Sequence, residues 1–151
     1  MAEPRVGILI GSESDRPVME ECLRRLQELG VAAELRVSSA HRDPEGTRDY
    51  ARQAASRGIR VLVAGAGMAA HLAGALASES LLPVIGVPLE AGALRGIDAL
   101  LATAQMPTGV PVATMAIGGA ANAAIFAAQI LALEDPGLAE RLVNLRRSWR
   151  T

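Results

Sequence analysis

The chain has 151 residues, half of them hydrophobic and only 2% aromatic, and all 15 of its basic residues are arginine. This length fits one domain with a sizeable core, and 15 basic against 16 acidic residues give no electrostatic reason to expect nucleic acid or a membrane surface as partner. The lack of lysine excludes Schiff-base chemistry and a P-loop lysine, and the single cysteine, Cys22, excludes an intrachain disulfide and a metal site of several thiolates.

Short apolar runs alternate with helix-like stretches along the whole chain. The first run holds only about six apolar residues, far fewer than a signal peptide needs, so we expect a cytoplasmic protein. Short runs rich in valine, isoleucine and leucine predict strands at residues 5–10, 33–37, 60–64, 84–87 and 112–117. The stretches between and after them, several of which begin or end near proline or glycine, predict helices at 16–29, 44–57, 69–80, 97–104, 119–133 and 137–147.

This alternation predicts the fold class. Apolar strands that alternate with helices are typical of a parallel sheet covered on both faces. We therefore expect an α/β three-layer sandwich with a flavodoxin-like, parallel five-stranded sheet and an extra C-terminal helix. No internal repeat or linker divides the sequence, so residues 1–151 are expected to form a single domain.

In such sheets, ligands bind beyond the carboxyl ends of the strands, where helix N-termini offer free backbone N–H groups. The turn after the first strand holds Gly11, Ser12, Ser14 and Asp15 before a helix with Pro17 in its first turn. Ser14 or Asp15 is expected to cap that helix. The same polar groups also suit a phosphate and ribose hydroxyls.

The second turn contains Ser39, His41 and Arg42, followed by a helix that begins near Pro44. Arg42 and Ser39 can bind an anion beside His41, and only His41 and His71 have an unperturbed pKa near neutrality. This turn is therefore predicted to combine anion binding with proton transfer.

The third turn is rich in small residues around Gly67, whose backbone N–H groups can face a carboxylate. Met68 is expected to be a packing residue. For His71 we favour a partly buried, hydrogen-bonded place near a helix start over proton transfer. No carboxylate or cysteine accompanies the histidines at ligand spacing, so no metal site is predicted. Composition does not decide whether residues 88–96 and 105–111 are surface connections or pocket walls.

Residues 99–133 carry no charged side chain, although 20 of the 31 charged residues lie in residues 1–60. A membrane span needs about 20 apolar residues, but prolines, glycines, Asn122 and Gln129 interrupt this stretch. Burial by the sheet and by another subunit explains the missing charge better, which predicts a homo-oligomer.

Five ordered motifs resemble those of the N5-carboxyaminoimidazole ribonucleotide mutases, class I of the PurE family, over residues 6 to about 133. The family patterns are G-S-x-S-D-x-x-x-M, S-A-H-R, A-G-A-G followed by A-A-H-L, P-V-x-G-V-P and Q-M-P-x-G-V-P-V-A-T. They are matched by residues 11–19, 39–42, 64–72, 83–88 and 105–114.

The resemblance implies a homo-octamer that moves a carboxyl group from the exocyclic nitrogen of an aminoimidazole ribonucleotide to ring carbon C4, with no cofactor, metal or ATP. It implies that the carbamate releases CO2 inside the pocket, that C4 attacks this CO2, and that His41 moves the ring proton. The implied substrate-binding residues are Ser12, Ser14, Asp15, Ser39, Arg42, Gly67 and His71.

The sequence departs from the family pattern at a few positions. Met68 stands where glycine is common, Ala73 where proline is usual and Asp43 where threonine is frequent, and the 118–122 segment is shorter. Two alternatives stay open: a carboxylase that uses free CO2, and a non-catalytic flavodoxin-like module for a nucleotide or flavin. Against flavin, the three aromatic residues (Tyr50, Phe126 and Trp149) lie outside the proposed pocket turns.

Overall fold

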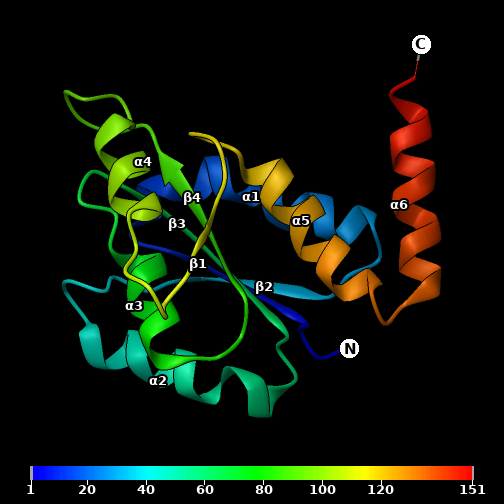
Figure 1. Cartoon of the computed structure of the whole chain (residues 1–151), viewed down its shortest axis with the longest axis horizontal. Helices are drawn as coiled ribbons and strands as arrows, with labels where there is room; N and C mark the ends of the chain where they lie inside the picture. The colour runs from blue at the N-terminus through cyan, green and yellow to red at the C-terminus, as the bar shows by residue number, and fades with distance from the viewer. Residues whose placement is uncertain (1, 151) are drawn as a thin grey trace.

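Five parallel strands form one sheet in the computed structural model, which describes residues 2–150. The strands are β1 (Val6–Ile10), β2 (Ala33–Val37), β3 (Val61–Gly67), β4 (Val84–Leu89) and β5 (Ala113–Thr114). They lie in the order β2-β1-β3-β4-β5, with every neighbouring pair parallel (Figure 1). This is the flavodoxin-like order, which confirms the predicted fold class.

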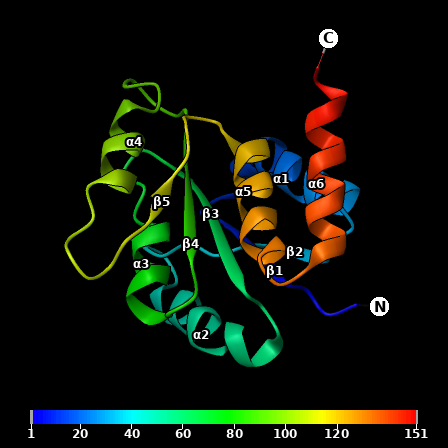
Figure 2. The same ribbon diagram turned by 45° about the vertical axis from the view of Figure 1, so that its right-hand side comes forward.

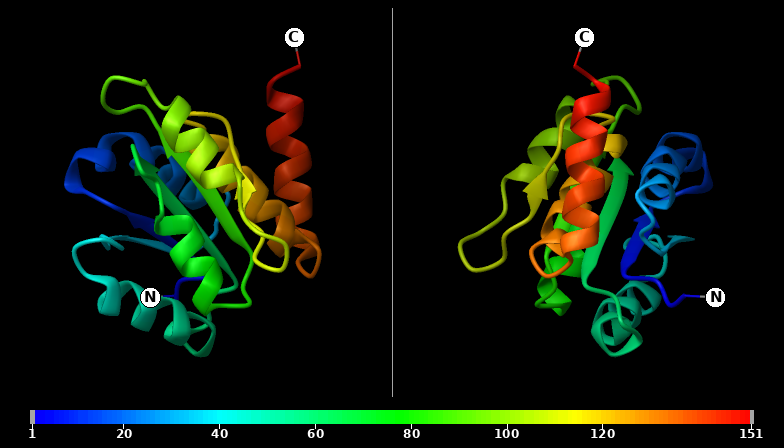
Figure 3. Two further views of the ribbon diagram at one scale, coloured as in Figure 1. Left: turned by 60° about the vertical axis from the view of Figure 1, so that its left-hand side comes forward. Right: turned by 90° about the vertical axis from the view of Figure 1, so that its right-hand side faces the viewer.

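Helices cover both faces of this sheet, as Figure 2 shows. One face carries α1 (Arg16–Glu28), α5 (Ala120–Ala132) and α6 (Pro136–Ser148). The other carries α2 (Pro44–Ala54), α3 (Leu72–Glu79) and α4 (Ile97–Ala104). Two short 3-10 helices, η1 (Glu13–Asp15) and η2 (Ala55–Arg57), adjoin α1 and α2. The additional C-terminal helix, α6, lies on the outside of the molecule next to α5 (Figure 3).

The two faces have separate hydrophobic cores because successive side chains of a strand point to opposite sides. Along β1, Ile8 and Ile10 pack with α1 and α5, whereas Leu9 packs with α2 and α3. All three side chains are fully buried. Burying each one stabilises the fold by roughly 1.5–3 kcal/mol, so β1 supports both layers.

Proline and glycine set the ends of the first two helices as the sequence predicts. Pro17 and Pro44 lie in the first turns of α1 and α2, and the carboxylate of Asp43 accepts a hydrogen bond from the Gly46 N–H at 3.0 Å. Gly30 and Gly58, which follow α1 and η2, have φ of +73° and +90°. Glycine adopts this left-handed backbone at little cost.

Two predicted elements are shorter than expected. The helix predicted at 69–80 begins only at Leu72, because Met68 has a left-handed backbone and the Ala70 N–H donates to its carbonyl at 2.8 Å. The strand predicted at 112–117 pairs with β4 only at Ala113 and Thr114. A turn closed by the Gly119 N–H and the Ala116 carbonyl then leads the chain out of the sheet.

The uncharged stretch at residues 99–133 is divided among α4, β5 and α5. Within residues 2–150, no helix has both the length and the apolar character needed to cross a membrane.

A polar cluster lies on β2, one edge strand of the sheet. The Tyr50 hydroxyl and the Arg57 guanidinium each donate to Oε1 of Glu34 at 2.7 Å, and Arg36 donates to Oε2 at 3.2 Å. Arg36 and Arg57 also lie over the Tyr50 ring, 5.5 and 5.4 Å from its centroid. Burial acts to raise the pKa of Glu34, but these partners lower it below its ordinary value.

Candidate active site

A cavity of about 320 Å³ lies beyond the carboxyl ends of β1 to β4. This volume falls within the usual range for small-molecule sites. All eight predicted site residues line it, brought together from three separate turns. The lining residues are Gly11, Ser12, Ser14, Asp15, Ser39, Ala40, His41, Arg42, Ala66, Gly67, Met68, Ala69, His71, Leu72 and Ala91.

The β1–α1 turn contributes two hydroxyls and a carboxylate. Ser12 caps η1, since its Oγ accepts from the Ser14 N–H at 3.3 Å and from the Ser14 hydroxyl at 3.0 Å. Asp15 occupies the N-cap position of α1, but its side chain makes no capping hydrogen bond. The prediction that Asp15 is the N-cap residue is therefore confirmed in position, but without a capping hydrogen bond the Asp15 carboxylate lines the cavity.

The environment of Asp15 changes its acidity. Burial raises the pKa of this carboxyl above its ordinary value, and a backbone hydrogen bond of Ser12 opposes the change only in part. A partly desolvated carboxylate gains most from new hydrogen-bond donors. Asp15 is therefore well suited to accept hydrogen bonds from ligand hydroxyls.

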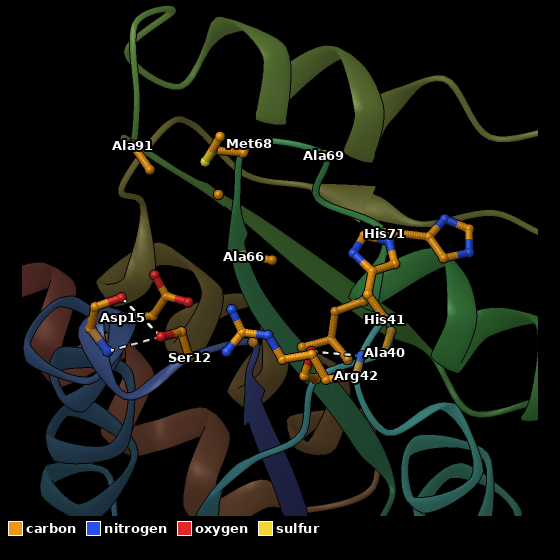
Figure 4. Close-up of a pocket in the computed structure, with 15 residues that line it drawn as sticks. Ser12, Asp15, Ala40, His41, Arg42, Ala66, Met68, Ala69, His71 and Ala91 are labelled. Atoms are coloured by element: carbon orange, nitrogen blue, oxygen red, sulfur yellow. Dashed lines mark hydrogen bonds between the residues drawn. The ribbon is translucent and has the colours of Figure 1, made fainter.

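The β2–α2 turn places Ser39, His41 and Arg42 on the opposite side of the cavity. The Arg42 N–H donates to Oγ of Ser39 at 3.2 Å, and this bond closes the turn that carries His41 and Arg42. Figure 4 shows the Arg42 side chain directed across the cavity towards Ser12 and Asp15. A planar guanidinium beside hydroxyl groups has the chemistry that suits an anion such as a phosphate.

His41 lies beside His71, the first residue before α3. Their rings are nearly parallel, at 11°, with centroids 6.0 Å apart (Figure 4). Both side chains are exposed, and His71 makes no side-chain hydrogen bond at the start of α3. The expected burial of His71 is therefore wrong: the turn at Met68 delays the helix and leaves the imidazole at the cavity.

Close packing behind the cavity requires small residues. A methyl group on Gly67 would lie 2.9 Å from Cβ of Ala91, and one on Gly65 would lie 2.6 Å from the sulfur of Met19. The buried Met19 thus packs directly on β3. This contact gives a structural reason for the methionine that ends the first sequence motif.

Met68, Leu72 and Ala91 are lining residues that the predicted site residues did not include. Met68 is 57% exposed, so its expected role as a packing residue is wrong. Ala91 shows that the loop after β4 forms a pocket wall, whereas the 105–111 loop does not line this cavity. The sequence carries no signal for these contacts, because each depends on how close the ends of β3 and β4 lie.

The lining contains no tyrosine, phenylalanine or tryptophan on which a flavin ring would stack. Across residues 2–150, no group of three or more histidine, cysteine, aspartate or glutamate side chains is arranged to hold a metal ion.

Comparisons with known proteins relate nearly the whole chain to one protein family. The family model described as AIR carboxylase matches residues 5–151. The N5-carboxyaminoimidazole ribonucleotide mutase of Pyrococcus abyssi is 50% identical over 147 residues, which are 97% of this chain and 84% of that protein. The mutase of Mycobacterium tuberculosis is 54% identical over 140 residues, which are 93% of this chain and 80% of that protein.

A solved structure agrees with these sequence matches. The crystal structure of Treponema denticola PurE has a TM-score of 0.87 and 27% identity, covering 96% of this chain and 90% of that chain. Both kinds of comparison confirm the resemblance that the motifs predict, over nearly the whole sequence.

Proposed function

We propose that this chain, which belongs to the AIR carboxylase family, converts N5-carboxyaminoimidazole ribonucleotide to 4-carboxy-5-aminoimidazole ribonucleotide in purine biosynthesis. Relatives that bear the mutase name are 50% and 54% identical to it over more than nine-tenths of its length. The observation that carries the proposal is the single cavity in which the motif residues of three turns meet. Residues 1–151 would act together as one catalytic domain.

Polar residues of the first two turns support ribonucleotide binding. The Arg42 guanidinium and the hydroxyls of Ser12, Ser14 and Ser39 would bind the phosphate and ribose, and the Asp15 carboxylate would accept hydrogen bonds from ribose hydroxyls. Arg42 suits a phosphate because its planar fork donates two parallel hydrogen bonds.

His41 and the third turn support the chemistry. The carbamate C–N bond breaks to release CO2, and the exocyclic nitrogen takes up a proton from His41, which acts here as the general acid. Ring carbon C4 then attacks the carbon of CO2, and the C4 proton leaves to His41, so the net reaction is an isomerisation. Gly67, whose backbone lines the cavity, would face the carboxylate, and His71 would contact the substrate beside His41.

The substitution His41→Asn tests this function. We expect turnover to fall by about 10²–10⁴-fold, the usual contribution of a general acid or base, while ribonucleotide affinity measured by calorimetry stays within about twofold. Normal turnover in this variant would remove His41 from the mechanism.

Supplying substrates separately distinguishes the mutase from a carboxylase. The wild-type chain should turn over the carbamate without added CO2 and should be slow with aminoimidazole ribonucleotide and free CO2. The reverse preference would favour the carboxylase, which is the activity named in the description of the family model. The cytoplasmic location and the homo-octamer stay predictions.

A further inference from the structure

Met68 has an unusual backbone for a residue with a side chain. Its φ is +55°, and within residues 2–150 only one other non-glycine residue, Arg95, has a positive φ. In this left-handed region, Cβ crowds the following carbonyl oxygen, so only glycine adopts it cheaply. Strained residues that the fold retains tend to lie at functional sites.

Folding gains little from the methionine itself. The side chain is 57% exposed, and its outer atoms lie beside Gly92 in the loop after β4. A methyl group built on Gly92 would lie 3.6–3.7 Å from Cγ, Cε and Sδ of Met68, so the whole side chain extends along that glycine. Glycine at position 68 would adopt the same turn without strain, and packing therefore does not explain the methionine.

The position of the side chain points to a role in the cavity. Met68 extends from the end of β3 to the loop after β4, where Ala91 and Gly92 lie. Figure 4 shows Met68 and Ala91 side by side at one end of the cavity, away from Arg42. Met68 thus lies beside the loop after β4, at the end of the cavity remote from the Arg42 guanidinium.

We propose that Met68 is a pocket-wall residue that keeps released CO2 beside the ribonucleotide and keeps water out. This inference rests on the proposed function, because that reaction has a CO2 intermediate. CO2 is uncharged and small, so the protein has to retain it with a physical barrier. Methionine suits a movable barrier, since its side chain is apolar, unbranched and has three rotatable bonds.

Escape of CO2 has a defined chemical outcome. After the C–N bond breaks, the exocyclic nitrogen takes up a proton from His41, and without recapture the products are aminoimidazole ribonucleotide and free CO2. Retention instead forms the bond from C4 to the CO2 carbon, and the C4 proton leaves to His41. The fraction of turnovers that exchange CO2 with the solution therefore measures the barrier.

The experiment supplies unlabelled carbamate substrate in buffer with ¹³C-bicarbonate, with carbonic anhydrase present to equilibrate it with CO2. The ¹³C content of the product and the aminoimidazole ribonucleotide formed per turnover are measured, after subtraction of the enzyme-free rate. We expect little label with the wild type, and an increase of fivefold or more with Met68→Ala and Met68→Gly. Met68→Leu, which keeps the apolar volume, should remain within twofold of the wild type.

Each outcome has one meaning. Met68→Gly relieves the strained backbone, so one truncated variant is expected to fold even if Met68→Ala does not. Equal ¹³C labelling of the product by the wild type and by a folded truncated variant would overturn the role of Met68. Full exchange of CO2 in the wild type would also overturn it. The same holds if Met68→Leu labels the product as much as Met68→Ala does. If the wild type fails to convert the carbamate at all, the proposed function itself is wrong.

Discussion

Asp15 is a partly buried acidic residue in the lining of the cavity. Its carboxylate faces the cavity without a capping hydrogen bond, and burial raises its pKa above the ordinary value for aspartate. The side chain therefore costs the free protein some electrostatic free energy. Hydrogen bonds from a bound ribose would recover part of it.

The raised pKa predicts a pH dependence of binding. Asp15 takes up its proton at a higher pH than an ordinary aspartate does. On acidification, ribonucleotide affinity should therefore begin to fall at a higher pH than it would with an unperturbed carboxylate. Asp15→Asn should bind about tenfold more weakly at neutral pH, as expected for a lost hydrogen bond to a charged group, and should lose this part of the pH dependence. Calorimetric titrations from pH 7.5 to 4.5 measure both effects.

The variant is also the control for titration of the phosphate group, which changes affinity in both proteins. If wild type and Asp15→Asn show parallel pH profiles, Asp15 does not bind the ligand through its charge.

At the scale of elements, the start of α2 links stability to the site. The Asp43 carboxylate caps α2 through the Gly46 N–H, and Asp43 directly follows Arg42. At α6, Asp135 caps the helix through the Leu138 N–H at 3.1 Å, on the outer layer of the molecule. Both caps are aspartates that accept from a backbone N–H, although Asp135 also accepts from Arg5 at 3.2 Å, and they lie at different distances from the cavity.

Removal of each cap should therefore separate stability from binding. We expect Asp43→Ala and Asp135→Ala each to lower the free energy of unfolding by about 1 kcal/mol. Only Asp43→Ala should weaken ribonucleotide binding, by about three- to tenfold, because it loosens the turn that carries His41 and Arg42. Urea unfolding and calorimetry provide the two readouts. An equal loss of affinity in Asp135→Ala would show that general destabilisation is responsible.

Element boundaries could be predicted where local chemistry decides them. Proline in the first turn and glycine after the last one define α1 and α2, and the apolar composition of β1 and β4 defines buried strands. The start of α3 could not be predicted, since nothing in the sequence requires a left-handed backbone at Met68. The shortness of β5 likewise depends on a turn at Ala116 that follows from its place beside β4.

The same distinction applies to the site. Its three turns could be predicted to meet, because the carboxyl ends of parallel strands share one edge of the sheet. The contact of Met68 with Gly92 and the wall at Ala91 could not, because they depend on distances between loops that are far apart in sequence.

At the scale of the whole molecule, apolar side chains on the surface support the predicted oligomer. Leu94, Ile97 and Leu101, on or just before α4, are 54–61% exposed, and Leu81 and Leu133 are more exposed still. Clusters of exposed apolar side chains mark interaction surfaces more often than single ones do.

We therefore expect light scattering at micromolar concentration to give a mass several times the 15.7 kDa of one chain, about eightfold for the predicted octamer. Leu101→Glu should shift the mass towards smaller species, because it places a charge in an apolar contact. Gln53→Glu, on an exposed position of α2, is the matched control. A wild-type mass near that of one chain would contradict the explanation of the uncharged 99–133 segment.

The two edges of the sheet affect the tendency of the folded protein to aggregate. β5 offers only two residues for pairing, and β2 carries Glu34, which accepts hydrogen bonds from Arg36, Tyr50 and Arg57. Short and charged edge strands are poor templates for adding a strand from another molecule. Folded copies therefore have little tendency to join edge to edge into aggregates, and association is left to the apolar helix surfaces. Aggregation of this protein should accordingly follow the fraction of chains that are unfolded.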